Sequence, residues 1–182
     1  MSALADLHDG DHRLARHVAS WRSDCARRVL PAVSEAAEHT KLWWGAALTM
    51  AAVGGWRGRR AAAAGVVSMA VAEVVSNCVI KQLWQRRRPP KEWFPNEEVH
   101  DRPDSSSFPS GHTAAAVGFT AAVAPVWPAA GAVCAVPAVM VAAERVHTGA
   151  HYPSDVVAGT AIGLAVAALV HRAPRLVARR LL

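Results

Sequence analysis

The chain has 182 residues, of which 52% are hydrophobic and 19% are charged, and its mean hydropathy is only +0.14. This length is enough for one domain with a sizeable core. The formal charge of +6 and the isoelectric point near 10.0 favour anionic partners, such as a phospholipid surface or a phosphorylated substrate. They do not favour nucleic acid, because the basic residues are scattered between apolar segments and do not form a recognisable nucleic-acid-binding element.

Residues 1–40 form a mixed-charge segment in which apolar side chains recur at spacings of three and four: Leu14, Val18, Trp21, Cys25 and Val29. This pattern predicts an amphipathic helix that is interrupted at Pro31. The helix either packs on the protein as an ordinary surface helix or lies in a membrane interface. The first residues, MSALADLHDGDH, are acidic and lack an apolar run, so we expect no signal peptide. A soluble exported enzyme is therefore disfavoured.

Five apolar stretches follow within residues 41–182, which we interpret as a single membrane-embedded domain. They cover residues 42–56, 61–84, 112–126, 129–143 and 155–170. At a rise of about 1.5 Å per residue, a helix over the second stretch can cross a hydrocarbon layer of about 30 Å. The first, third and fourth stretches are too short unless their helices also include flanking residues. Their small residues suit close helix packing in a bilayer. The sequence thus predicts an all-α bundle of about five spanning helices, with a soluble Ala-rich bundle as the alternative.

The ends of these stretches indicate how the bundle is oriented. Tryptophans lie at or near the ends, as interfacial anchors do: Trp43, Trp44, Trp56, Trp84 and Trp127. Basic clusters at 57–60 and 171–180 follow the first and the last stretch. With five crossings both clusters fall on one side, which the positive-inside rule makes cytoplasmic. The two polar loops, 85–111 and 144–154, then share the external face.

The stretch KQLWQRRRPP places two cations on one side of a helix end. Lys81 and Arg88 are seven residues apart, or two helical turns, so one helix face can present both. The helix ends at the following proline pair. We expect Arg86 and Arg87 to contact lipid headgroups as a basic cluster. Upstream, Glu73 and Asn77 lie on the face that leads to Lys81. Glu73 is either a buried hydrogen-bonding group that joins two helices or a support for the cationic site.

The stretch SSSFPSGHTAAA places polar residues at the threshold of an apolar helix. It is either a turn with an ordinary helix cap or a site for an anion. Amide N–H groups at a helix start, together with the helix dipole, form a ready site for phosphate, and Ser110 and Gly111 can offer such groups with little steric obstruction. His112, in the first turn, can hold a proton for delivery.

The stretch ERVHTGAHYPSD leads into the last apolar helix and contains Arg145, His151 and Asp155. Asp155 is a candidate cap of that helix, and it is also a candidate partner for the imidazole. A carboxylate that accepts one ring N–H leaves the other nitrogen free to attack. Together the cations, histidines and carboxylate suit phosphoryl transfer without a metal, because cations and amides neutralise the equatorial oxygens.

We expect no metal and no disulfide framework. The sequence has no HExxH motif and no CxxC pair, and Cys78 and Cys134 lie inside apolar stretches.

These three stretches, KQLWQRRRP, PSGH and RVHTGAHYPSD, resemble the three signature motifs of the type 2 phosphatidic acid phosphatase family. They occur in order within 75 of the 182 residues. The chain departs from the pattern at Glu144, where the family usually has serine before the arginine.

The resemblance implies that His151 is the nucleophile that takes the phosphoryl group, that Asp155 orients it, and that His112 protonates the leaving oxygen. It implies a phosphate site made of Lys81, Arg88, Ser110, Gly111 and Arg145. It also implies a multi-pass helical protein of the cell membrane, with no cofactor and with its site on the extracytoplasmic face.

The expected function is removal of a terminal phosphate from a lipid phosphate or diphosphate through a phosphohistidine intermediate. Polyprenyl phosphates, polyprenyl diphosphates and phosphatidic acid-like lipids are the expected substrates. The partners are therefore the lipid phosphate and the bilayer, with no nucleic acid, and homo-oligomerisation is left open. Two alternatives remain, a vanadate-dependent haloperoxidase-like enzyme and a non-catalytic lipid-binding membrane protein.

Overall fold

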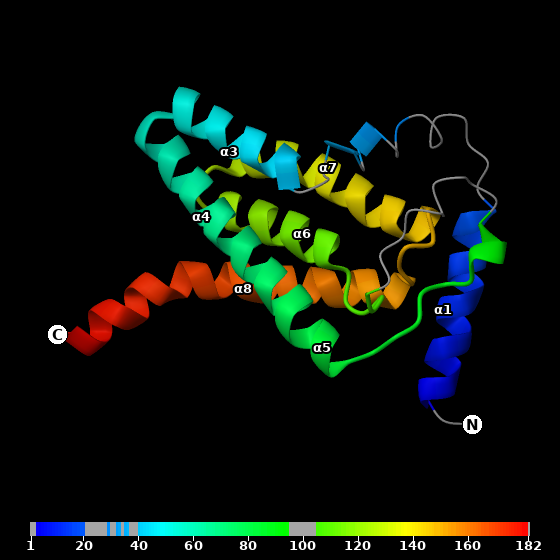
Figure 1. The fold of residues 1–182 in the computed structure, drawn as a ribbon. Helices are drawn as coiled ribbons and strands as arrows, with labels where there is room; N and C mark the ends of the chain where they lie inside the picture. Colours follow the sequence, from blue (N-terminus) through cyan, green and yellow to red (C-terminus); the bar gives the residue numbers. More distant parts are fainter. Residues whose placement is uncertain are drawn as a thin grey trace.

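The computed structural model describes residues 3–20, 29, 32–33, 35–36, 40–94 and 105–181, and Figure 1 shows the arrangement of its helices. Every regular element within these ranges is a helix, which confirms the all-α prediction. The main helices are α1 (Ala3–Ala19), α3 (Lys41–Val53), α4 (Gly55–Glu73), α6 (Gly111–Val123), α7 (Pro128–His147) and α8 (Pro153–Leu181). The bounds of α3 and α6 follow the predicted apolar stretches to within a few residues, whereas α4 begins at Gly55 and not at 61, and α8 continues past the predicted end at 170 to Leu181.

The second predicted stretch forms one long helix with a change of pitch inside it. After α4 the chain continues as a π-helix, η2 (Val74–Ile80), and a last α-helical turn, α5 (Lys81–Leu83). The helix begins earlier than predicted, so the basic cluster 57–60 lies in its first turns instead of in a loop. The reason is the glycine pair that ends α3, because Gly55 has a φ of +54°, a conformation that glycine adopts without strain.

Helix α6 lies in the middle of the bundle and packs against α4, α7 and α8 (Figure 1). Its alanines and glycines are almost all buried, and this small-residue surface lets neighbouring backbones approach closely. A Cβ atom added to Gly163 of α8 would lie 2.7 Å from the carbonyl oxygen of Ala114 in α6. Trp43 of α3 and Phe119 of α6 fill the opposite side of the core, with ring centroids 5.4 Å apart.

Three helices are long and apolar enough to cross a membrane, judged by length and composition: Gly55–Leu83, Pro128–His147 and Pro153–Ala173. Large apolar side chains point outward from them, including Val133, Val139 and Leu164, as lipid-facing residues do. Helices α3 and α6 have 13 residues each. They are shorter than a span of about 20 residues, so the expected five crossings stay a prediction.

The ends of the bundle differ in character. The turn between α3 and α4 and the C-terminal end of α8 lie at one end, whereas the connections after α5 and α7 meet at the other, where α1 crosses (Figure 1). Helix α1 is present as predicted, but its docked face carries Asp11 and Ala15, both buried, whereas Leu14 is 55% exposed. The predicted continuation through Trp21 and Cys25 lies outside the described residues.

Candidate active site

His151 lies buried at the loop end of the bundle, in the connection between α7 and α8. Its Nδ1 is 2.6 Å from the main-chain oxygen of Ser107. A carbonyl oxygen only accepts hydrogen bonds, so Nδ1 carries the proton. In the neutral ring the lone pair is then on Nε2, which is the atom that can attack an electrophile.

Asp155 is fully buried in the first turn of α8. Its Oδ2 accepts a hydrogen bond from the N–H of Tyr152 at 2.9 Å. Asp155 is thus the third residue of the helix and bonds back to the residue before it, as in a capping box, and is not itself the N-cap. The same Oδ2 lies 3.8 Å from Nδ1 of His151, which is too long for a hydrogen bond. The carbonyl of Ser107 therefore fixes the ring tautomer, and the carboxylate acts on the ring through its charge.

Arg86 is the partner of the other Asp155 oxygen. Its Nη1 donates to Oδ1 of Asp155 at 2.6 Å, and its Nη2 donates to Asp11 of α1 at 2.7 Å. The guanidinium also lies 4.2 Å from the ring centroid of Tyr152. The expectation that Arg86 contacts lipid headgroups is therefore wrong, whereas the side chain of Arg87 is exposed.

The start of α6 is tied to the same loop. The N–H of Ser110 donates to the main-chain oxygen of Asp155 at 3.0 Å, and its Oγ caps the helix by accepting from the N–H of Thr113 at 3.4 Å. The amide of Ser110 is thus already engaged, and the next amides, those of Gly111 and His112, are the ones at the helix start that suit an anion. The side chain of His112 is exposed.

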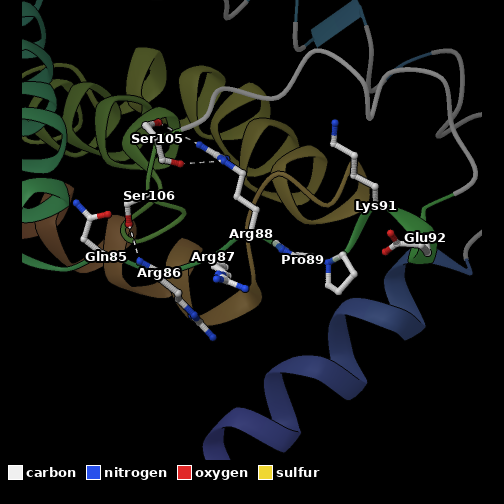
Figure 2. Close-up of a pocket in the computed structure, with 10 residues that line it drawn as sticks. Gln85, Arg86, Arg87, Arg88, Pro89, Lys91, Glu92, Ser105 and Ser106 are labelled. Carbon is white, nitrogen blue, oxygen red and sulfur yellow. Dashed lines mark hydrogen bonds between the residues drawn. The ribbon is translucent and has the colours of Figure 1, made fainter.

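Arg88 is held over the same loop by three hydrogen bonds. It donates from Nη1 to the main-chain oxygen of Ala150 at 2.6 Å, and from Nε and Nη2 to the oxygens of Ser105 at 3.2 and 3.3 Å. Figure 2 shows Arg88 and Arg86 pointing to opposite sides of the segment that carries them. Arg88 therefore bonds to the loop that holds His151, whereas Arg86 bonds to the carboxylates of Asp155 and Asp11.

The other two predicted cations, Lys81 and Arg145, come from helix ends. Lys81 begins α5 directly after the π-helix and is half-buried. The helix ends at Leu83, so the prediction that it continues to the proline pair and presents Lys81 and Arg88 on one helix face is wrong. Arg145 lies in the last turn of α7, where its Nε pairs with the buried carboxylate of Glu144. The departure from the family pattern at Glu144 thus places a carboxylate directly against the arginine that the resemblance assigns to phosphate binding.

The electrostatics of the loop end favour a neutral imidazole. Burial lowers the pKa of His151 to about 4, and the charge of Arg88 acts in the same direction, while Asp155 and the Ser107 carbonyl oppose it. Burial also lowers the pKa of Arg88, Asp155 raises it, and the positive charge of Arg145 lowers it. Arg88 and Arg145 therefore lie in one electrostatic neighbourhood with Asp155, and Arg88 stays charged because its ordinary pKa is so high.

Two hollows open beside these residues. The larger, of about 680 Å³, is lined by the basic segment 85–92 together with Ser105 and Ser106 (Figure 2). The smaller, of about 400 Å³, is lined by Asn77, Lys81, Gln82, Gln85, Ser105 and Ser106. Both volumes fall within the range of ligand pockets.

Within the described ranges, no group of three or more His, Cys, Asp or Glu side chains could hold a metal ion. What the site offers instead is fixed positive charge, free helix amides and an imidazole with its lone pair on Nε2. That combination can bind an anionic tetrahedral group and attack it.

The sequence analysis did not single out Ser107 or Asp11, and it assigned Arg86 to lipid headgroups. Ser107 and Arg86 contact the predicted site residues His151 and Asp155, and Asp11 contacts Arg86. Every residue has a main-chain oxygen, so the sequence does not show that the one of Ser107 binds the ring. The three adjacent arginines have the same side chain, so the sequence does not show which of them binds a carboxylate. Asp11 lies 143 residues from its partner Ser154, so no local pattern could connect them.

Comparisons with known proteins agree with this site. Residues 61–178 match the family model described as PAP2 superfamily. A decaprenylphosphoryl-5-phosphoribose phosphatase of Mycobacterium tuberculosis is 41% identical over 96 residues, which is 50% of this chain and 50% of that protein. A lipid A 1-phosphatase of Rhizobium etli is 46% identical over 57 residues, 31% of this chain and 25% of that protein. The chain thus matches half or less of the length of these relatives.

A solved structure is similar in fold. The crystal structure of a transmembrane PAP2 type phosphatidylglycerolphosphate phosphatase from Bacillus subtilis has a TM-score of 0.69 to this chain at 20% identity. The likeness covers 93% of this chain and 87% of that one. At this identity it shows the membrane-protein fold and nothing more specific.

Proposed function

Because the chain belongs to the PAP2 superfamily, we propose that it is an integral membrane lipid phosphatase that removes a terminal phosphate from a lipid phosphate or diphosphate. The matched relatives are named as phosphatases of lipid A and of a decaprenyl lipid that carries phosphoribose. Their names support a lipid substrate with a phosphomonoester. Polyprenyl phosphates and diphosphates and phosphatidic acid-like lipids belong to the same class.

One observation carries the proposal: the buried His151 has its Nδ1 bonded to the carbonyl of Ser107 at 2.6 Å, beside the cations. The lowered pKa of about 4 keeps the ring neutral at pH 7, and the tautomer places the lone pair on Nε2. A neutral imidazole of this kind is an activated nucleophile.

In the proposed mechanism, Lys81, Arg88, Arg145 and the amides of Gly111 and His112 hold the phosphate. Nε2 of His151 forms a bond to phosphorus while the bond from phosphorus to the lipid oxygen breaks. Desolvation and the positive charges of Arg145, Lys81 and Arg88 lower the pKa of His112 to about 3, so His112 takes up a proton from water when the phosphate anion is bound and then donates it to the lipid oxygen. The product is a phosphohistidine with a positively charged ring, which the Asp155 carboxylate stabilises from 3.8 Å. Water then attacks phosphorus, His112 takes a proton from the water, and phosphate leaves as the imidazole becomes neutral again.

The side of the membrane that the site faces follows from the distribution of basic residues between the two ends of the bundle. The basic clusters lie at the end of the bundle away from the site, and the positive-inside rule makes that end cytoplasmic. The phosphatase site then faces the extracytoplasmic side, where it meets lipid phosphates of the outer leaflet. Labelling a cysteine placed at Lys91, an exposed residue in the connection after α5, with a membrane-impermeant reagent in intact cells tests this placement.

The decisive experiment is phosphate release from a panel of purified lipid phosphates by the protein in detergent. We expect release that His151→Ala abolishes, that a chelator leaves unchanged, and that vanadate inhibits, because vanadate mimics five-coordinate phosphorus. Absence of release from the whole panel contradicts the proposal and favours a lipid-binding protein. Oxidation of halide by peroxide in the presence of vanadate favours a haloperoxidase-like enzyme instead.

A further inference from the structure

We propose that helix α1 completes the active site, with Asp11 as a positioning residue that holds Arg86 and the start of α8 in their working geometry. This inference rests on the proposed phosphatase function. It gives a specific role to a segment that lies outside the residues matched by the family model, 61–178.

The Asp11 carboxylate uses both of its oxygens. It is 5% exposed, and its Oδ1 accepts the N–H of Ser154 at 2.9 Å. Its Oδ2 accepts Nη2 of Arg86 at 2.7 Å and the hydroxyl of Ser154. The position of a buried carboxylate with this many partners is fixed, because the loss of any hydrogen bond leaves an unpaired buried polar group.

Arg86 connects Asp11 to Asp155, the carboxylate beside the proposed nucleophile His151. Its Nη1 donates to Asp155 at 2.6 Å and to the hydroxyl of Ser154 at 2.7 Å. A guanidinium is planar, so the position of its Nη2 on Asp11 fixes the direction in which Nη1 meets Asp155. The carboxylate of Asp155 in turn lies 3.8 Å from the ring of His151. Loss of the Asp11 charge therefore loosens Asp155 at the moment when the ring becomes positive.

Helix α1 is held in place by a second, separate set of contacts. His12 stacks on Tyr152, with centroids 5.1 Å apart and planes at 12°, and meets Trp93 edge-on at 5.1 Å. The Arg16 guanidinium lies 4.9 Å from the centroid of Trp93. Since these contacts do not involve the carboxylate, Asp11→Asn leaves the helix docked and tests positioning alone.

The test compares Asp11→Asn with Asp9→Asn, which changes an exposed acid two residues earlier on the same helix. For Asp11→Asn we expect kcat to fall about tenfold with KM unchanged, because the stabilisation of the charged ring is lost while the phosphate-binding cations remain. Asp9→Asn keeps the kcat of the natural chain. Asp11→Glu restores part of the kcat, since the charge returns with a shifted geometry.

A double-variant cycle separates positioning from a general effect on the fold. If Asp11 acts through Arg86, Asp11→Asn adds almost nothing to the loss already caused by Arg86→Gln. An unchanged kcat in Asp11→Asn, an equal loss in Asp9→Asn, or losses that multiply in the double variant would each overturn the proposal. If Asp11→Asn does not fold, Ser154→Ala takes its place in the cycle, because it removes the hydroxyl that joins Asp11 and Arg86.

The smaller hollow, beside Lys81, is independent of this network. We infer that it receives hydroxyl groups on the part of the substrate that bears the phosphate, an inference that also rests on the proposed phosphatase function. Every residue of its lining is polar: Asn77, Lys81, Gln82, Gln85, Ser105 and Ser106. Carboxamides both donate and accept, as hydroxyl groups do, so they recognise a sugar or polyol better than a bare hydrocarbon.

The position of the hollow matches the leaving group. A Cβ atom on Gly111 would lie 2.6 Å from Oδ1 of Asn77, so this amide packs directly against the residue before His112, the proposed acid. Asn77 lies within the π-helix Val74–Ile80, a rare element that is frequent at functional sites. Within the described part of the chain, the side chains of Asn77, Gln82 and Gln85 have no hydrogen-bond partner. Their amides are thus available for a ligand.

Exposed apolar side chains border the hollow. Leu83 and Trp84, between the two glutamines, are 78% and 64% exposed, as residues at a membrane interface are. Ser105, on the opposite wall, is the residue that Arg88 holds. A substrate whose phosphate contacts Arg88 can therefore place neighbouring hydroxyls against the amides.

The test measures kcat/KM for a matched pair of lipids: lysophosphatidic acid, with a hydroxyl beside the phosphate-bearing carbon, and an alkyl phosphate of the same length without it. We expect about a tenfold preference for the hydroxylated lipid. The variant Gln82→Met with Gln85→Met should bring the ratio of the two kcat/KM values, measured within that variant, close to one. Equal kcat/KM for both lipids, or a preference that survives both substitutions, overturns the inference. Failure of the phosphatase proposal differs, because neither lipid then releases phosphate.

Discussion

The buried, neutral state of His151 makes the stability of the fold depend on pH in a defined direction. In the unfolded chain the ring has its ordinary pKa near 6.5, whereas in the folded protein the pKa is about 4. Between these two values the unfolded chain binds a proton that the folded protein does not bind. Unfolding therefore becomes more favourable as the pH falls through this window, and the destabilisation is complete below about pH 4.

The size of the effect follows from the difference between the two pKa values. Each pH unit inside the window costs about 1.4 kcal/mol, so a fall from pH 6.5 to pH 5 removes about 2 kcal/mol from the free energy of unfolding. This range stops above the pH at which most carboxylates titrate. The free energy of unfolding of a folded domain is roughly 5–15 kcal/mol, so this loss is a large fraction of it.

The assay is reversible denaturant unfolding in mixed micelles at pH 7, 6 and 5, for the natural chain and for His151→Gln. The two proteins share every other titrating group, so the difference between their unfolding free energies isolates His151. We expect the natural chain to lose about 2 kcal/mol relative to the variant over this range. A difference that stays constant with pH would show that His151 is not buried as a neutral ring, and the proposed nucleophile would lose its basis.

Three further predictions concern the rest of the site and the bundle. Arg88→Lys should lower kcat/KM for a lipid phosphate by about tenfold or more, because a point charge cannot replace the guanidinium bonds to Ala150 and Ser105; phosphate release at low substrate concentration measures this, and an unchanged value rules out a phosphate-binding role. His112→Ala should slow hydrolysis of a phosphomonoester more than that of a diphosphate, whose leaving group is less basic; equal losses in the two assays argue against His112 as the acid. Gly163→Ala should destabilise the fold by about 1–3 kcal/mol, because the new methyl group meets the α6 backbone at 2.7 Å; Gly45→Ala, with open space around it, is the control in thermal unfolding.

The helices were readable from the sequence because each is a long apolar run with recognisable ends. The start of α6 at Gly111 coincides with the Ser-Gly-His threshold, and α8 begins at the proline of the Tyr-Pro-Ser-Asp segment. The sorting of basic residues also placed the two polar connections at one end of the bundle. The structure agrees, since Arg88 bonds to Ala150 and Ser107 bonds to His151 across those connections.

Sequence reasoning reached less far where neighbouring residues have the same chemistry. Arg86, Arg87 and Arg88 are identical on paper, yet one bridges two carboxylates, one is exposed and one holds the loop. The roles differ because the segment is irregular after α5, so no periodicity predicts which side each arginine faces.

By itself, then, the sequence determined the all-α class and the gathering of three motifs at one end of the bundle, and it proposed most of the residues of the candidate site. Those features depend on local apolar periodicity and on the sign of charges, which are properties of short segments. Only the tertiary structure decided that the Ser107 carbonyl, and not Asp155, bonds to the ring of His151, and that Asp11 reaches this site from α1. Such contacts join segments far apart in the chain, and their geometry depends on how whole helices pack, which no local pattern encodes.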